Sequence, residues 1–401
     1  MSSVSSVLRR CGACLLSLAL GLSMTGCTTY KNFHEAFFEK DQEQEVIKIG
    51  IFEPQTGADA AEAAEEIKGI ELAHDLYPEV MGKQVEFVYG DNQSDVEMAR
   101  TVAQQLVDAD VRLVLGSYKS TLSLAGSDIF EAADVPAIGI SITNPIVTQT
   151  NEFYFRVCFV DAFQGISAAH YVHDYLKQND AVCFKQAGDD YADTMIEQFR
   201  QRMDRLTAGS GKVTVLEYPE GTEDFSIYLT RVGATGCKAV FFPCSASVGY
   251  KVLYQAAPMG LQWIGCAKWE SLQETAAAAV LDGNISYLNG VTYVKGFDAA
   301  SSVTPMTEVF KKAYQETYGD ELPSENCALG FDAYLMALEG IRLSEDTDDG
   351  VILTSKLKSI RNLEGATGYI SINSQGDPSK DVVIEVITNN GSAVVYTVAP
   401  N

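Results

Sequence analysis

Two turns rich in small hydroxyl side chains are the places in this sequence where chemistry could occur. Gly116-Ser117-Tyr118-Lys119-Ser120-Thr121 follows a β-branched run and opens an amphipathic one, and Ser141-Ile142-Thr143-Asn144-Pro145 follows the next β-branched run. Free backbone N–H groups at a helix start, joined by serine or threonine hydroxyls, hold a carboxylate or similar anion. The alternative is that Ser120 and Ser141 only cap helices and form turns. Because two such turns follow consecutive strands, the pattern favours binding.

Other apparent motifs lack the context that catalysis or metal binding needs. Gly209-Ser210-Gly211-Lys212 precedes a predicted strand instead of following one, and Val213 stands where a phosphate loop has Ser or Thr. His170 and His173 lie one turn apart on a predicted helix, without a third ligand in the pattern. No serine or cysteine comes with a convincing histidine and acid. We therefore expect no catalytic residue, no metal and no cofactor.

The scaffold for these turns is an alternation of short β-branched runs with longer amphipathic runs. A first series predicts helices at 60–76, 96–108 and 121–133, and strands at 46–52, 85–89, 112–116 and 137–140. A second series predicts helices at 164–179, 192–206, 225–232 and 247–257, and strands at 181–184, 212–216, 239–242 and 262–265. A helix at 331–343 and two antiparallel strands in the tail, at 382–386 and 393–396, follow. This order predicts an α/β protein with two doubly wound parallel sheets, whose ligands bind beyond the carboxyl ends of the strands.

The N-terminal segment has the pattern of an export signal. Arg9 and Arg10 precede a short apolar run at 14–22, and Met24-Thr25-Gly26-Cys27 follows. We expect residues 1–26 to be a signal peptide. Cys27 resembles the lipidated cysteine of a bacterial lipobox, with Met24 where leucine is usual, and 27–45 then form a tether that anchors the protein without spanning the membrane. A plain signal peptide with a chance cysteine is the alternative.

Length, charge and cysteines narrow the class of protein. About 375 residues follow the signal, which suits two domains. The net charge of −25 argues against nucleic acid and anionic membrane surfaces as partners. Six cysteines follow Cys27: Cys158, Cys183, Cys237, Cys244, Cys266 and Cys327. Export permits disulfides, and six free thiols fit equally well. If one pair forms, we favour Cys244 with Cys266, because both end predicted strands that could be neighbours.

The ordered series of motifs resembles the type I periplasmic binding proteins, and most of all the branch for branched-chain amino acids and related ligands. The segments that carry this resemblance are 49–57, 69–73, 116–128, 136–145, 155–156, 164–165, 189–191 and 330–334. The resemblance covers nearly all of the mature chain. It implies two α/β lobes joined by three hinge crossings, near 156–160, 290–294 and 367–370. Lobe I would then comprise 46–157 and 295–366, and lobe II 158–294 and 367–401.

The resemblance also implies a ligand site. The turn at Ser120 and Thr121, together with Thr143, would offer hydroxyls to a ligand carboxylate, joined by backbone groups of Ser141. Tyr191 matches a tyrosine that closes on the ligand from the second lobe, or else it only packs between the lobes.

Two stretches depart from the family's amino-acid binders. Those proteins place an aromatic residue after the strand that ends here at Phe242, where this chain has Pro243-Cys244-Ser245-Ala246. They place an acid that pairs with the ligand's ammonium just after the strand that ends at Gly265, where this chain has Cys266-Ala267-Lys268-Trp269-Glu270. We expect Ser245, Trp269 and Glu270 to reach the ligand here, with Trp269 as an aromatic wall. Because the acid is missing at the matching place, a ligand without an ammonium group, or a peptide-like one, stays open beside an amino acid.

These expectations describe a monomeric, extracytoplasmic solute-binding lipoprotein of an ABC importer, anchored to the bacterial cell membrane by lipidated Cys27. It would capture a small amino acid or related carboxylate and deliver it to a membrane permease, and the ligand would favour the closed form because only there does it bridge both lobes. A sensory or regulatory module of the same fold is the main alternative. An extracellular α/β enzyme and a protein-binding scaffold with an empty cleft are two further ones.

Overall fold

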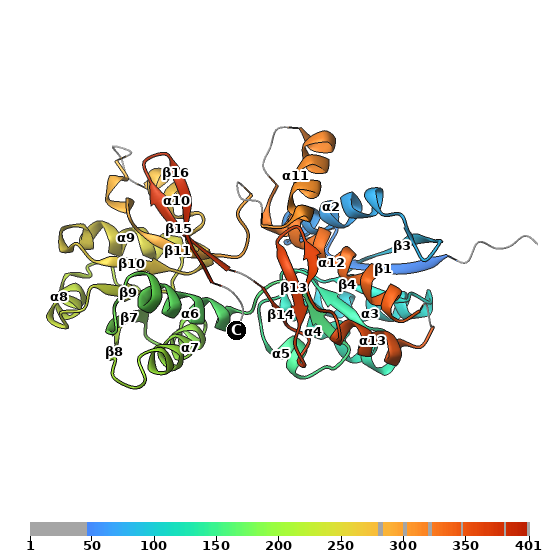
Figure 1. Ribbon diagram of the computed structural model, residues 1–401, viewed down its shortest axis with the longest axis horizontal. Coiled ribbons are helices and arrows are strands. Elements are labelled where there is room, and N and C mark those ends of the chain that lie inside the picture. The colour runs from blue at the N-terminus through green and yellow to red at the C-terminus, as the bar shows by residue number, and fades with distance from the viewer. Residues whose placement is uncertain are drawn as a thin grey trace, which may run out of the picture. The chain divides into compact units, whose positions relative to one another are not determined.

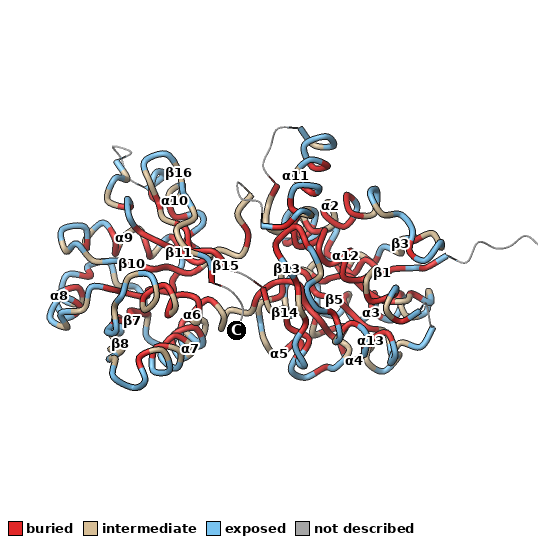
Figure 2. The backbone as a smooth tube through the Cα atoms, in the orientation of Figure 1, coloured by how far each residue is buried: buried red, intermediate tan, exposed pale blue. Residues whose placement is uncertain are grey.

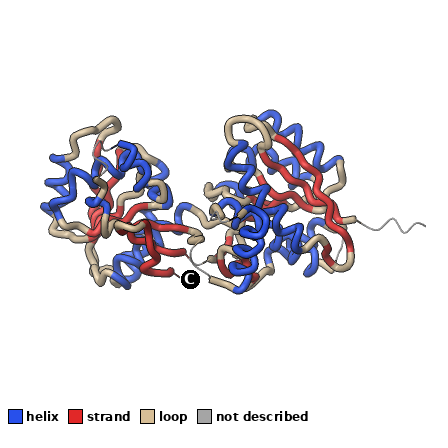
Figure 3. Tube along the Cα trace, turned by 90° about the horizontal axis from the view of Figure 1, so that it is seen from above, coloured by secondary structure: helices blue, strands red, loops and turns tan. Residues whose placement is uncertain are grey.

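The structure, a computed structural model, describes residues 46–398 except 280–283, 300–302, 320–322, 346–347 and 381. The expected signal peptide, Cys27 and the tether lie outside the described residues. In the described part of the chain, the strands form two large sheets and one small one, with helices against them (Figures 1 and 3). No helix in this part is long and apolar enough to cross a membrane.

The first large sheet has six strands in the order β2-β3-β1-β4-β5-β6. Four of them are parallel, with Ile49 of β1 opposite Leu113 of β4, and Ile138 of β5 opposite Phe155 of β6. The strands are β1 (Ile47–Glu53), β2 (Glu79–Val80), β3 (Lys83–Asp91), β4 (Leu113–Gly116), β5 (Ala137–Gly139) and β6 (Tyr154–Arg156). The sequence predicted four of these strands and missed the short β2 and β6.

Helices cover this sheet and bury its apolar side chains. They are α2 (Ala60–Leu76), α3 (Val96–Asp108), α4 (Ser120–Ala132), the short α5 (Ile146–Gln149) and, from later in the chain, α12 (Glu325–Leu343). One core joins Phe52 and Val114 of the strands to Leu106 of α3 and Phe130 of α4. Helices α2 and α12 approach closely at Gly69, where an added Cβ would strike the backbone of α12. This packing holds Glu66 of α2 beneath the strand ends.

The second large sheet has seven strands in the order β16-β15-β11-β10-β9-β7-β8. Strands β7 to β11 are parallel. Strands β15 and β16 add the antiparallel pair that the sequence predicted in the tail, and the structure places Ile384 opposite Tyr396. The strands are β7 (Ala181–Gln186), β8 (Val213–Tyr218), β9 (Ala239–Phe241), β10 (Gln262–Gly265), β11 (Thr292–Lys295), β15 (Val382–Thr388) and β16 (Gly391–Val398).

Alternating side chains of this sheet form two cores, one on each face, so that its central strands are buried throughout (Figure 2). Val182 and Phe184 belong to one core, and Ala181 and Cys183 to the other. The helices of this part are α6 (Asp161–His170) with the π-turn η1 (Tyr171–Tyr175), α7 (Asp190–Leu206), α8 (Ser226–Ala234), α9 (Ala246–Ala256), α10 (Leu272–Ala279), and the 3-10 turns η2 (Ala257–Met259), η3 (Ala267–Trp269) and η4 (Ser286–Leu288). The helix expected to reach residue 179 thus ends sooner, and Lys177 follows with a left-handed φ of 57°.

The chain passes between the two large sheets three times. It does so between β6 and α6 at 157–160, between β11 and α11 (Pro305–Tyr318), and between β14 (Pro378–Ser379) and β15. The remaining elements are α13 (Gly350–Lys358) and the strands β12 (Leu363–Gly365) and β13 (Gly368–Ile372), which form the small sheet with β14.

Two crossings lie later in the chain than the sequence suggested. Strand β11, at 292–295, pairs with β10 and β15 inside the second sheet. Strand β13, at 368–372, pairs with β12 and β14. Asp377, which follows β13, forms an ion pair with Arg156 of β6 at 2.8 Å. Residues 367–379 therefore pack with the first sheet, because their hydrogen bonds and this buried ion pair lie there.

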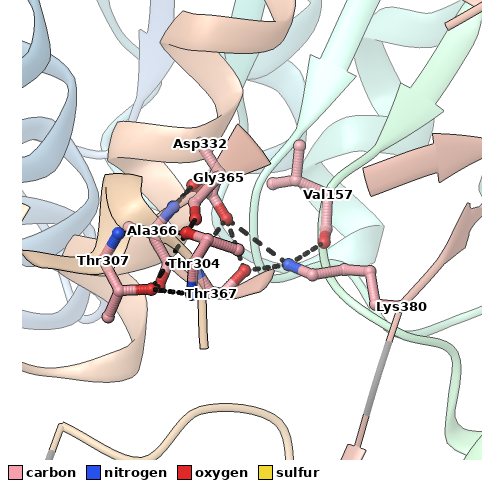
Figure 4. Close-up of polar contacts among 8 residues, drawn as sticks. All are labelled: Val157, Thr304, Thr307, Asp332, Gly365, Ala366, Thr367 and Lys380. Atoms are coloured by element: carbon pink, nitrogen blue, oxygen red, sulfur yellow. Dashed lines mark hydrogen bonds and ion pairs between the residues drawn. The ribbon is translucent and has the colours of Figure 1, made fainter. Parts of the chain in front are cut away.

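A buried polar network ties the three crossings together (Figure 4). Asp332 of α12 accepts hydrogen bonds from the backbone N–H groups of Ala366 and Thr367 and from the Thr367 hydroxyl. Lys380, in the third crossing, lies 3.5 Å from this carboxylate and donates to Thr367 and, at 3.0 Å, to the carbonyl of Val157 in the first crossing. Thr304, which ends the second crossing, donates to the carbonyl of Gly365 at 2.7 Å.

Candidate ligand-binding site

A cavity of about 260 Å³ lies beyond the carboxyl end of β5. Three of the residues expected from the sequence line it, namely Ser141, Thr143 and Tyr191. The others are Cys158, Phe159, Asp161, Gln164, Ala267, Lys268, Glu325, Asn326 and Leu329. Its size suits a small metabolite. A larger surface hollow of about 730 Å³, along Tyr250, Tyr254 and Tyr287, borders residues outside the described part and lies away from the strand ends.

The turn that opens α4 lies next to this cavity without lining it. The Ser120 hydroxyl accepts a hydrogen bond from the backbone N–H of Asn144 at 3.3 Å, which links the two hydroxyl-rich turns. The first helical hydrogen bonds run from Leu122 and Ser123 to the carbonyl of Lys119. The N–H groups of Ser120 and of the exposed Thr121 precede them, and in the part of the chain that the structure describes no acceptor is bonded to either, which leaves both available to an anion.

Trp269 is not the aromatic wall that we expected. Its side chain is fully buried in the core of the second sheet, where its ring meets Phe242 edge-on at 5.9 Å. Gly265 and Gly249 make room for it: a Cβ on Gly249 would lie 2.9 Å from the indole Nε1. Trp269 belongs to the 3-10 turn η3, and this turn directs its side chain into the core of the second sheet.

Ser245 and Glu270 also differ from the expectation. Ser245 is exposed, and its hydroxyl lies 2.9 Å from that of Ser247. Glu270 is exposed and forms an ion pair with Lys295 at 3.0 Å. Neither is among the residues that line the cavity. Lys268, one residue before Trp269, occupies the place at the cavity instead.

Ser141 is bonded to a buried acid that the sequence did not reveal. Its hydroxyl donates to the carboxylate of Glu66, and its backbone N–H does the same. Glu66 points from α2 toward Glu53, the last residue of β1, and both are fully buried. In this structure the Ser141 N–H is therefore committed to Glu66, and the contact of Ser141 backbone groups with a ligand carboxylate stays a prediction.

Burial raises the cost of ionising both acids, Glu53 and Glu66. Glu53 Oε1 and Glu66 Oε2 have no protein donor in the described part of the chain, while Glu53 Oε2 accepts from the Tyr118 N–H at 2.6 Å. Burial raises the pKa of Glu66 to about 7, although hydrogen bonds from Ser141 and Glu53 lower it. Burial and repulsion from Glu66 raise the pKa of Glu53 well above its usual value. A protonated carboxyl can donate a hydrogen bond, so a proton on one of these acids would give the facing oxygen of the other a donor.

Thr143 is bonded to an acid as well. Its hydroxyl hydrogen-bonds the carboxylate of Asp161, the first residue of α6, and Gln164 Nε2 donates to the same carboxylate at 3.2 Å. Gln164 Oε1 in turn accepts from the N–H of Ala267 at 2.8 Å. Burial raises the pKa of Asp161, although Thr143 and Lys268 oppose this rise. The chain of contacts joins the end of β5 to the turn after β10.

Tyr191 and Lys268 form the remaining polar part of the cavity. The Lys268 ammonium lies 3.4 Å from the centre of the Tyr191 ring, a cation–π contact. Burial raises the pKa of the Tyr191 hydroxyl, so that it stays protonated. Asp189 caps α7 by accepting from the N–H of Tyr191 at 3.1 Å and so fixes the start of the helix that carries this ring.

All six cysteines after Cys27 are free thiols, and all but Cys237 are buried. Cys244 and Cys266 are neighbours, as the strand order suggested, because the Cys266 thiol donates to the Cys244 carbonyl at 3.5 Å. They form no disulfide. Burial raises the pKa of Cys158, which lines the cavity, to about 12, so this thiol is not a nucleophile at neutral pH.

The chain forms two α/β units that are connected by three crossings, and a cavity lies at the ends of the strands. This arrangement is typical of a protein that binds a small ligand. The chain belongs to the periplasmic binding protein family, whose model matches residues 46–391. Members of this family are extracytoplasmic binding proteins and not enzymes, as the sequence led us to expect.

Similar proteins support this assignment. An amino acid binding protein of Pseudomonas aeruginosa is 28% identical over 201 residues, which cover 49% of this chain and 53% of that protein. The match thus spans about half the length of that relative. A leucine-binding protein of Thermotoga maritima is 27% identical with a TM-score of 0.68, covering 88% of this chain and 99% of that one. A branched-chain amino acid transporter substrate-binding protein of Streptococcus pneumoniae, solved with isoleucine, is 25% identical with a TM-score of 0.67, covering 89% and 100%.

Proposed function

We propose that this chain is the solute-binding lipoprotein of an ABC importer, that it takes an amino acid or related carboxylate into the cavity at Ser141, Thr143 and Tyr191, and that it delivers this ligand to a membrane permease. The cavity carries the proposal, because it lies at the strand ends where this fold binds its ligands. The relatives are named for amino acids, leucine or branched-chain amino acids.

The start of α4 is the place that we propose for a ligand carboxylate. The N–H groups of Ser120 and Thr121 lie at a helix N-terminus, and the dipole of α4 favours a negative charge there. The Ser120 hydroxyl keeps its proton for the ligand, because in its bond with Asn144 it acts as the acceptor. We therefore propose that Ser120 donates to the ligand carboxylate, because the Ser141 hydroxyl and N–H already donate to Glu66.

Ser120→Ala is expected to weaken the binding of an α-amino acid by roughly 10- to 100-fold, because it removes a hydrogen bond to a charged group. A thermal-shift panel of the twenty amino acids identifies the best one, and calorimetry on the wild type and variant gives the two Kd values. Ser359→Ala, which removes an exposed hydroxyl bonded to the Lys356 carbonyl, is the matched control. Equal affinity of Ser120→Ala and the control would refute the carboxylate site.

Lipidation and transport are tested in cells. Cys27→Ala should release the protein from the membrane fraction, because an acyl chain needs this thiol.

Deletion of the protein should abolish uptake of the radiolabelled amino acid that binds best, and the wild-type chain should restore it. Normal uptake in the deletion strain would instead favour the sensory module.

A further inference from the structure

Two hydroxyl side chains that line the cavity donate to the protein's own acids. The Ser141 hydroxyl and N–H both serve Glu66, and the Thr143 hydroxyl bonds Asp161. A hydroxyl that donates to a carboxylate turns its lone pairs toward other partners. Ser141 and Thr143 therefore present acceptors to whatever occupies the cavity.

Glu325 adds a second carboxylate to the cavity. It is the first residue of α12, it lines the cavity half-buried, and within the described residues no hydrogen bond or ion pair reaches its oxygens. Gly296 leaves the space for it, since a Cβ there would strike both Glu325 Oε1 and the Phe159 ring. A carboxylate held at a cavity wall without a counter-charge is costly unless a ligand supplies one.

The cations that act on Glu325 from the protein are committed elsewhere. Lys295 pairs with Glu270 at 3.0 Å and with Glu385 at 3.5 Å. Lys380 pairs with Asp332 and donates to the Val157 carbonyl. Lys268, which also lines the cavity, lies over the Tyr191 ring. The cavity thus holds two carboxylates, those of Asp161 and Glu325, against one lysine.

We propose that the ligand carries a protonated nitrogen and that Glu325 is its counter-ion, with the Ser141 and Thr143 hydroxyl oxygens accepting from the same group. This inference rests on the proposed binding function and names its ligand class, which excludes carboxylates that lack a basic nitrogen. Glu325 would do the work of the acid that the sequence lacks after Gly265. The acid comes from the start of α12 because Lys268 occupies the usual place.

Matched probes separate the charges. Calorimetry on the full-length protein compares L-leucine with two analogues: 4-methylpentanoate, which lacks the ammonium, and 3-methylbutylamine, which lacks the carboxylate. L-Lysine and 4-hydroxybenzoate are measured in the same way. We expect binding by nitrogen-bearing probes and at least about thirty-fold weaker binding by the two plain acids. Binding of 3-methylbutylamine shows whether the protonated nitrogen alone is enough for binding or whether the ligand also needs its carboxylate.

Glu325→Gln keeps the shape of the side chain and removes its charge. We expect this variant to bind the nitrogen-bearing probes about thirty-fold more weakly and to bind 4-methylpentanoate no worse, because repulsion is lost. Glu316→Gln, on the exposed face of α11 beside Lys312, is the control. Thermal unfolding of both variants confirms that they fold.

The pH dependence provides a second measurement. Burial and the Glu270 charge raise the pKa of Glu325 to about 7, while Lys380 and Lys295 oppose this rise. Ligand binding needs the ionised carboxylate, so affinity should fall on the order of tenfold per pH unit as the pH drops below 7. Asp161 and Lys268 also face the cavity, and the loss of this slope in Glu325→Gln assigns it to Glu325.

The outcomes separate the inference from the function on which it rests. Equal binding of 4-methylpentanoate and L-leucine, with no effect of Glu325→Gln, would overturn the counter-ion and leave the binding protein intact. Binding of none of the probes would overturn the proposed amino-acid function and this inference with it.

Discussion

Asp332→Ala should lower the free energy of unfolding by about 3 to 5 kcal/mol, because it leaves the buried Lys380 ammonium without its carboxylate. The same change removes the acceptor of the Ala366 and Thr367 N–H groups, which stay buried. These contacts join segments that cross between the two sheets, so the loss should appear as one large decrease in the urea midpoint or in Tm.

A double-mutant cycle tests whether this effect belongs to the ion pair. Lys380→Met removes the charge and keeps an apolar stem in the buried space. If the pair is the cause, the double variant is less destabilised than the sum of the two single variants, because no charge is left unpaired. Strict additivity, or a loss below about 1 kcal/mol for Asp332→Ala, would show that the network contributes little.

The unliganded protein should be more stable at pH 5 than at pH 8, and Glu66→Gln should remove about 2 to 3 kcal/mol of this difference. The pKa of Glu66 is raised by burial from its usual 4.5 to about 7, so the native state holds a proton that the unfolded chain has released. This contribution is full below about pH 4.5 and is lost as the pH rises through about 7.

Glutamine mimics the protonated acid and keeps an acceptor for Ser141, so Glu66→Gln should stabilise the protein at pH 8 and change it little at pH 5. The measurement is urea unfolding of the wild type and the variant at the two pH values, without ligand. Glu62→Gln, an exposed position one turn earlier on α2, is the matched control. If the wild type and Glu66→Gln show the same pH slope, Glu66 does not titrate in this range.

Much of the fold could be read from the sequence because hydrophobic periodicity is local. The bounds predicted for α2, α3 and β10 agree with the structure. The elements that were missed, such as β6, β13 and α13, are short or lack a clean period. The crossings were misplaced for a related reason: Thr292–Lys295 and Gly368–Ile372 are strands whose partners lie far along the chain, and pairing is not a local property.

The site was anticipated in part. Ser141, Thr143 and Tyr191 were expected from hydroxyl-rich turns and from a resemblance, and all three line the cavity. Trp269 was misjudged, because an aromatic residue at a strand end can turn into the core as readily as toward a ligand, and the small Gly249 and Gly265 beside it decide this. Glu325 follows a helix cap, where an acid is ordinary, so nothing in its surroundings in sequence distinguishes it.

The sequence by itself determined the α/β class, the family resemblance and the edge of the sheet where a ligand belongs, because these depend on the order of elements along the chain. Only the tertiary structure decided what the hydroxyls offer. Glu66 comes from a helix 75 residues before Ser141, and Glu325 from one far after it. Charges that meet across such separations alter each other's protonation and hydrogen bonding, and this coupling depends on distance in space, which folding alone establishes.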